Sequence, residues 1–260
     1  EAVEQLDKAV ELKPNYPFSY VDRAKAKSSS GDINGALADL TEAVNLDPDH
    51  YWNYIDRGKL RLYVGNLEGA HADFDRAAQL RPDYFLAYVY RGGANEDLDN
   101  PQAALSDYRK VAELRPDYYP IYQPYAILSF FRKNYLEAAR AFAKHYERYK
   151  KDHNHALMAG ACYYFAGEKE KGAAYLKKHM DQMPRETYMY DAARIFIEKG
   201  YESYLLTKLS SESKVTIKTR ALFYVALYHE LQGNLGLARK YYLEVDEANL
   251  YGIIETRLAE

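Results

Sequence analysis

Few residues in this chain have the types and spacing that catalysis or metal binding requires. His153 and His155 stand two positions apart, and on a helix that spacing points the two rings in different directions. No third ligand is evident beside them in the sequence. Cys162 is the only cysteine, so the chain cannot form an internal disulfide. Its neighbours Ala161 and Tyr163 predict a packed, unreactive thiol.

Longer chemical motifs are also missing from the sequence. We find no glycine-rich phosphate loop, no pair of cysteines with zinc-binding spacing and no nucleophile elbow. His145 and His179 stand 34 residues apart, at a position where the pattern described below places small packing residues. We therefore expect a protein that is not an enzyme and that has no cofactor and no metal site.

Two lysines offer a different kind of chemistry, the binding of a carboxylate. Lys25 and Lys59 are separated by 34 residues, so they could hold one acidic group of a ligand between them. Asp22 and Asp56 precede them by three residues. On a helix that spacing allows an ion pair, and intrahelical ion pairs are the simpler interpretation.

The spacing of 34 residues recurs through much of the chain. Pro14, Pro48, Pro82 and Pro116 follow it, and Pro184 lies two periods further on, while Lys150 occupies the intervening position. A fixed period of this length indicates stacked repeats. Each repeat reads as a helix, a Gly–Asn/Asp turn and a second helix that ends before proline, because glycine closes helices and Asn or Asp opens them. The helix-opening residues are Asp32, Asn66, Asn100 and Asn134.

Large and small side chains occupy matching columns of the repeat. The fourth position is Tyr20, Tyr54, Tyr88 and Tyr122, and the eighth is Ala24, Gly58, Gly92, Ala126 and Gly160. A large residue beside a small one lets two helix backbones approach closely. Pro120 and Pro124 interrupt one first helix, which we expect to begin late, near residues 121–125, since proline is tolerated only in the first turn.

These columns resemble the tetratricopeptide repeat family. Tyr54, Gly58, Ala70, Phe74 and Pro82 match its pattern within a single repeat. The resemblance implies an all-α fold, a right-handed superhelical solenoid of stacked antiparallel helix hairpins. Certain chaperone-binding members clamp a carboxylate with lysine at position 5 and asparagine at position 9. Here Val21 and Ile55 occupy position 5, so that clamp is not expected.

We expect one continuous array over residues 1–260, because repeats contact mainly their neighbours. Its predicted segments are a half repeat at 1–16, repeats at 17–50, 51–84, 85–118, 119–152 and 153–186, a degenerate repeat at 187–218, a repeat at 219–252, and the start of a C-terminal capping helix at 249–260. The half repeat suggests that the chain begins inside a repeat.

In the family that this chain resembles, a second stripe of each first helix lines the concave surface. Here that stripe is rich in aromatic and aliphatic side chains, which peptide recognition commonly uses. The predicted partner-binding groove consists of Lys25, Trp52, Ile55, Lys59, Tyr63, Ile127, Phe130, Phe131, Leu157, Tyr164 and Phe165. The alternative for the later aromatic residues is packing between neighbouring helices.

Composition narrows the class of partner. Residues 1–118 carry 14 Lys and Arg against 21 Asp and Glu, whereas residues 132–179 carry 11 against 5. Nucleic-acid binding would favour a strongly basic face. The basic residues around Arg140, Lys144 and Arg148 fall on a second helix, where a solvated face is the better interpretation. No run of about 18 apolar residues predicts a membrane span.

We therefore expect a non-catalytic scaffold or adaptor that binds a protein or peptide segment in its groove. The alternative is a homo-oligomer that assembles through its terminal helices and a surface rich in its 28 tyrosines. A third possibility is autoinhibition, in which residues 249–260 fold into the groove instead of capping the array. The chain's end is also similar to the ends of bacterial envelope lipoproteins with this repeat, which favours a bacterial periplasm or cell envelope over the cytoplasm.

Overall fold

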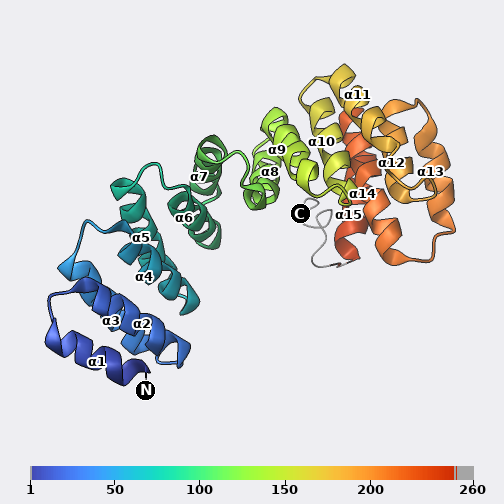
Figure 1. Ribbon diagram of the computed structural model, residues 1–260. Coiled ribbons are helices and arrows are strands. Elements are labelled where there is room, and N and C mark those ends of the chain that lie inside the picture. Colours follow the sequence, from blue (N-terminus) through green and yellow to red (C-terminus); the bar gives the residue numbers. More distant parts are fainter. Residues whose placement is uncertain (1, 249, 251–260) are drawn as a thin grey trace. The chain divides into compact units, whose positions relative to one another are not determined.

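Figure 1 shows the computed structural model, which describes residues 2–248 and residue 250. Within these residues every regular element is a helix, as the repeat pattern predicts. The chain divides into two compact units, residues 1–121 and residues 122–260. The predicted capping helix at 249–260 falls outside the described residues, apart from Leu250.

Unit 1 is a series of helices joined by short turns (Figure 1). It contains α1 (Ala2–Leu12), α2 (Pro17–Ser29), α3 (Ile33–Leu46), α4 (Tyr51–Tyr63), α5 (Leu67–Leu80), α6 (Phe85–Asp97), α7 (Pro101–Leu114) and the short 3-10 helix η1 (Tyr119–Ile121). Helices α2 and α3, α4 and α5, and α6 and α7 pack as hairpins, and α3 with α4 and α5 with α6 join one hairpin to the next. Unit 1 is thus a helical repeat solenoid.

Unit 2 contains α8 (Tyr122–Phe131), α9 (Tyr135–Arg148), α10 (His153–Phe165), α11 (Lys169–Met180), α12 (Tyr188–Ile197), α13 (Tyr201–Ser210), α14 (Val215–Leu231) and α15 (Leu235–Glu247). Helix α8 begins at Tyr122, as Pro120 and Pro124 predicted. The short degenerate repeat forms two ten-residue helices, α12 and α13. Helix α10 is buried along residues 154–163, where it packs against α9, α11, α12 and α14.

The turns follow the predicted chemistry in part. Gly31, Gly65, Gly167 and Gly233 all have positive φ, and Asp99 and Lys133 take the same left-handed conformation at the equivalent turns. Asp32 and Asn66 accept a hydrogen bond from the backbone of Gly35 and Gly69. Asn100 and Asn134 make no such capping bond, so this part of the prediction is wrong. At α7, Pro101 has no N–H at the first helical position, which lessens the need for a cap.

The tyrosine column has a hydrogen-bonding role as well as a packing role. The hydroxyl groups of Tyr20, Tyr54 and Tyr88 donate to the carbonyl oxygens of Pro14, Pro48 and Pro82, at 2.9, 3.0 and 3.1 Å. Each bond ties the first helix of one repeat to the end of the repeat before it. The proline and tyrosine periods therefore describe the two ends of one recurring contact.

A recurring ion pair joins the two helices of each hairpin in unit 1. Arg23 contacts Asp39, Arg57 contacts Asp73 and Arg91 contacts Asp107, each through two guanidinium nitrogens at 2.6–3.2 Å. The three aspartates are almost fully buried. Since a buried carboxylate must be neutralised and hydrogen-bonded, these pairs fix how the two helices face each other.

Some of these arginines also contact the preceding hairpin. The Nη1 atom of Arg23 lies 2.9 Å from Asp7 on α1, and Nη1 of Arg91 lies 2.5 Å from Asp75 on α5. Arg57 has threonine at the equivalent place, Thr41, and Arg61 joins Asp73 instead, at 2.8 Å. The ion pairs thus link successive repeats as well as paired helices.

We predict that Asp73→Ala strongly destabilises the protein, by about 3–5 kcal/mol, because it leaves Arg57 buried without its partner. The matched control is Asp49→Ala, which removes an exposed ion pair with Arg76 at 3.6 Å and should cost less than about 1 kcal/mol. Urea unfolding followed by circular dichroism measures both. Equal effects of the two substitutions would contradict the structural role of the buried pair.

Two glycines on equivalent helices should respond to alanine with opposite sign. A Cβ atom at Gly58 would lie 2.6 Å from the ring of Phe74, whereas at Gly93 it would meet nothing within 4 Å. Gly58→Ala should therefore lower the free energy of unfolding by about 1–3 kcal/mol through overpacking.

Gly93→Ala should instead raise the free energy of unfolding by up to about 1 kcal/mol through better helix propensity. Thermal unfolding of the two variants beside the unchanged protein compares them directly. A stabilised Gly58→Ala variant would show that this close helix contact is not rigid.

Candidate functional site

Some of the predicted groove residues of unit 1 line one pocket between α2, α3 and α4. The pocket has a volume of about 530 Å³ and is lined by Ala24, Lys25, Ser28, Ser29, Ile33, Leu40, Asp56, Lys59, Leu60 and Tyr63. Three of the predicted residues, Lys25, Lys59 and Tyr63, therefore share one site. Their positions follow from the repeat, since Lys25 and Lys59 occupy the same place on α2 and α4.

The two lysines of the pocket are exposed and unpaired. Within the described residues neither ammonium group has a carboxylate within 4.0 Å, so the predicted intrahelical ion pairs with Asp22 and Asp56 are wrong. The ammonium of Lys59 lies 5.9 Å from the centre of the Tyr90 ring. Both charges therefore remain available for a ligand.

The remaining walls combine apolar and hydrogen-bonding groups. Leu40 and Ala24 are buried side chains at the base of the pocket. Tyr63 stands at the rim with 76% of its surface exposed. The hydroxyl of Ser29 donates to the carbonyl of Lys25 at 2.9 Å. The pocket therefore offers cations and one carboxylate, that of Asp56, around an apolar base.

The next repeat does not continue the lysine pair. Gly93 stands on α6 at the place that Lys25 and Lys59 hold on α2 and α4, and no other atom lies within 4 Å of a Cβ built there. The candidate site is thus confined to the first two hairpins of unit 1.

Trp52 belongs to a neighbouring cluster of rings and does not line the pocket. Its ring centre lies 5.5 Å from that of Tyr51 and 5.2 Å from that of Tyr84. Trp52 is 41% exposed, so it presents an aromatic surface near the start of α4. Ile55, by contrast, is buried and contributes to the core of unit 1, which corrects its predicted place in an open groove.

Most of the predicted groove residues of unit 2 pack against other helices. Ile127 and Leu157 are fully buried, so they are core residues and not part of an accessible surface. Phe130 lies 6.3 Å from Phe165 between ring centres, and Tyr135 lies 5.0 Å from Phe165.

The other two predicted residues of unit 2 differ in exposure. The Tyr164 hydroxyl donates to the Phe196 carbonyl at 2.7 Å, which ties α10 to α12. Phe131 is 45% exposed. It is therefore the most open of the predicted residues in this unit.

Cys162 is completely buried and free, as the sequence predicts. Burial raises the pKa of its thiol well above the usual range, because a thiolate is poorly solvated in an apolar interior. The thiol is therefore unreactive in the folded chain.

The described residues include no helix that is both long enough and apolar enough to span a membrane.

Comparisons with known proteins point to one family. Two family models, both described as tetratricopeptide repeat, match residues 19–50 and residues 55–119. No curated protein sequence matches the chain.

Solved structures show the same fold at low sequence identity. The chain is similar to YrrB, described as a TPR protein with an unusual peptide-binding site, at 22% identity and a TM-score of 0.58 over 71% of this chain and 95% of that one. It is similar to MamA at 20% identity and a TM-score of 0.54, over 65% of this chain and 93% of that one. A tetratricopeptide repeat protein from Parabacteroides merdae ATCC 43184 matches 94% of this chain and 97% of its own length, at 15% identity and a TM-score of 0.51.

The matched segments cover the hairpins that carry the period of tyrosine, glycine, alanine and proline, and the similar structures share their helical architecture. Residues 19–50 and 55–119 therefore match the tetratricopeptide repeat family, and the chain shares its helical repeat fold.

Proposed function

We propose that this protein is a non-catalytic interaction scaffold that binds an extended, acidic segment of a partner protein in the pocket between α2, α3 and α4. The observation that carries the proposal is the pair of exposed, unpaired lysines, Lys25 and Lys59, above an apolar base. Repeats of this family typically serve as non-catalytic scaffolds. The peptide-binding site of YrrB, a structural neighbour, supports the same class of function.

The chemistry of the pocket favours a carboxylate beside an aliphatic side chain. Each ammonium group can donate to a carboxylate oxygen, and such charge-assisted hydrogen bonds are stronger than neutral ones. Leu40 and Leu60 offer an apolar surface to a neighbouring side chain of the ligand. Asp56 can accept a backbone N–H of an extended segment. This combination favours a peptide over a free inorganic anion, because an inorganic anion has no apolar group to pack against Leu40 and Leu60.

The ion pairs of unit 1 occupy nearby acidic residues, so these residues do not neutralise Lys25 and Lys59. Most acidic residues near the hairpin interfaces, such as Asp39 and Asp73, are already paired with arginine or lysine. Lys25 and Lys59 retain their charge for a ligand, although unit 1 as a whole is acidic. We include Trp52 in the proposal as an exposed aromatic anchor of unit 1.

We predict that charge reversal at the pocket abolishes selection of acidic peptides. The probe is an array of immobilised decapeptides in which acidic, amide and basic residues are varied around a leucine. The unchanged protein should select Asp and Glu over Asn and Gln. Lys25→Glu and Lys59→Glu should each weaken binding of the selected peptides by about tenfold or more, measured by fluorescence anisotropy.

The matched control is Lys8→Glu, which reverses an exposed lysine on α1 outside the pocket and should change the affinity by less than about twofold. Binding should also weaken at high salt, because exposed charges are screened. An array without preference for acidic peptides, or a double variant with full affinity, would refute the proposed site.

Self-association is the second candidate function, and one feature favours it. Leu12, at the end of α1, is 82% exposed, and Tyr16, which follows it, is 49% exposed. Exposed apolar side chains such as these form a surface that a second copy can cover.

We predict a monomer in light scattering at micromolar concentration, as expected for a scaffold whose groove is free. A dimer that dissociates on Leu12→Glu substitution, without loss of helicity, would favour the oligomeric function instead.

A further inference from the structure

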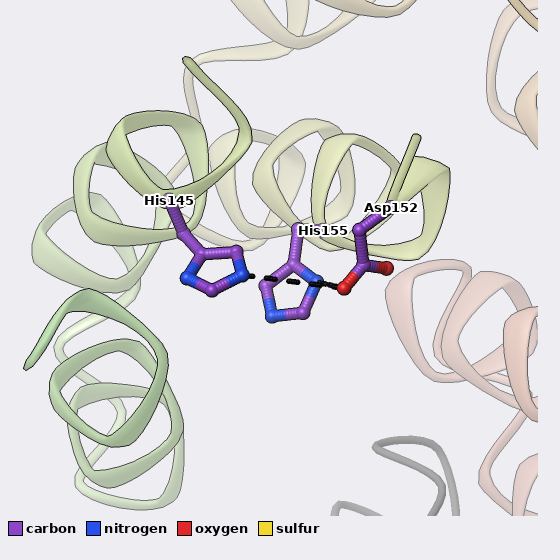
Figure 2. Close-up of side chains that lie close together, drawn as sticks. All are labelled: His145, Asp152 and His155. Carbon is purple, nitrogen blue, oxygen red and sulfur yellow. Dashed lines mark ion pairs between the residues drawn. The ribbon is translucent and has the colours of Figure 1, made fainter. Parts of the chain in front are cut away.

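Two histidines and an aspartate meet where α9 ends and α10 begins (Figure 2). His145 comes from α9, Asp152 directly precedes α10, and His155 lies in the first turn of α10. One ligand atom from each residue lies within 4.8 Å of the other two. The Nδ1 atom of His155 is 2.8 Å from Oδ2 of Asp152, and Nε2 of His145 is 4.0 Å from the same oxygen.

The sequence did not reveal this cluster, because its spacing crosses a helix boundary. His153 and His155 do point apart, as predicted, since His153 contacts the hydroxyl of Tyr146 at 3.0 Å while His155 faces His145. The partners of His155 are instead Asp152, three residues before it, and His145, on the preceding helix. The repeat pattern alone places His145 among the packing residues.

Three of the four imidazole nitrogens of the cluster are buried without a hydrogen bond to any described residue. His155 is 2% exposed and His145 is 7% exposed. In the described part of the chain, neither nitrogen of His155 makes a hydrogen bond of acceptable geometry, and Nδ1 of His145 has no partner. The 2.8 Å contact to Asp152 is therefore close but poorly aligned. Buried polar atoms without partners are rare in folded proteins and indicate a missing ligand or a role beyond packing.

The cluster supplies the types of ligand that a metal ion of the zinc class needs. A neutral imidazole nitrogen and a carboxylate oxygen are common zinc ligands, at about 2.0–2.2 Å from the ion. Tetrahedral ligands at that distance are roughly 3.3 Å apart, so the three ligand atoms need only small side-chain rotations to surround one ion.

Asp152 also fits this role. It stands at the N-cap position of α10 but makes no capping hydrogen bond, and its side chain is 40% exposed. The exposed side gives the ion a path from solvent and leaves room for a water as fourth ligand. The two imidazoles of the cluster favour an ion that nitrogen ligands bind well over a hard ion such as Mg²⁺, which prefers oxygen ligands.

We propose that His145, Asp152 and His155 bind one divalent transition-metal ion of the zinc type, which joins α9 to α10. The joint falls at a repeat boundary where Lys150 stands in the position of the periodic proline. The ion then fixes a connection that proline stiffens elsewhere in the array. The role of the ion is structural, because its ligands come from α9, from α10 and from the residue that precedes α10.

The test is metal binding by the purified full chain after removal of metals with EDTA. Equilibrium dialysis against Zn²⁺, followed by elemental analysis, should give one ion per chain. Zinc should also raise the temperature of unfolding, because an ion that binds the folded state stabilises it. With Co²⁺ in place of zinc, the visible absorption spectrum should be that of a tetrahedral site. This spectrum reports on the metal ligands without any change to the amino-acid sequence.

The variants His155→Ala, His145→Ala and Asp152→Asn should each lower zinc affinity by at least about tenfold, because each removes a ligand. His71→Ala, on α5 outside the cluster, is the matched control and should bind as the unchanged protein does. Circular dichroism without metal checks that each variant is folded. Absence of stoichiometric zinc, or loss of zinc on His153→Ala but not on His155→Ala, would overturn the proposal.

Discussion

The pairing of a buried aspartate with an arginine on the facing helix is the contact on which unit 1 depends. Arg23–Asp39, Arg57–Asp73 and Arg91–Asp107 each join the two helices of a hairpin. A buried carboxylate has few other ways to be satisfied, so the pair permits one rotation of each first helix. Lys25 and Lys59 stand two residues after Arg23 and Arg57 on the same helices. The orientation that buries the arginines is therefore the one that presents the lysines to the pocket.

Unit 2 is held together by different means. Its equivalent first helix has Tyr125 where unit 1 has arginine, and the hydroxyl of Tyr125 donates to Glu137 across the hairpin turn at 2.6 Å. Tyr242 and Glu230 make a similar bond at 2.8 Å. Helices α10 and α14 are buried over most of their length. The burial of these two central helices explains why Leu157, a predicted groove residue on α10, is part of a core.

The fold was predictable from the sequence because its signals are local and recur. Proline, glycine and tyrosine at a fixed spacing mark the turns and the close helix contacts, and the structure gives each of them a specific bond or conformation. The arginine and aspartate columns recur with the same period and could have been recognised. Their burial is harder to predict, because charged residues on a helix most often lie in solvent.

The candidate site was predictable only in part, because exposure depends on the neighbouring helices. Lys59 and Ile127 hold the same place in their repeats, yet Lys59 is exposed and Ile127 is buried. The sequence gives the face of a helix but not what covers it. The cluster of His145, Asp152 and His155 was hidden for a related reason, since a loop brings together residues whose spacing follows no single helix.

The burial of α14 against α10 has a consequence for how the chain can change in length. The Tyr224 hydroxyl lies 3.4 Å from the carbonyl oxygen of Asn154, a contact between residues 70 positions apart. In unit 1 the hairpins meet only their neighbours along the chain, so a whole 34-residue cassette can be inserted or removed there with its interfaces intact. Inserting or removing a cassette between Asn154 and Tyr224 would disrupt the packing of α10 against α14. Unit 1 is modular, whereas unit 2 is constrained to its present number of helices.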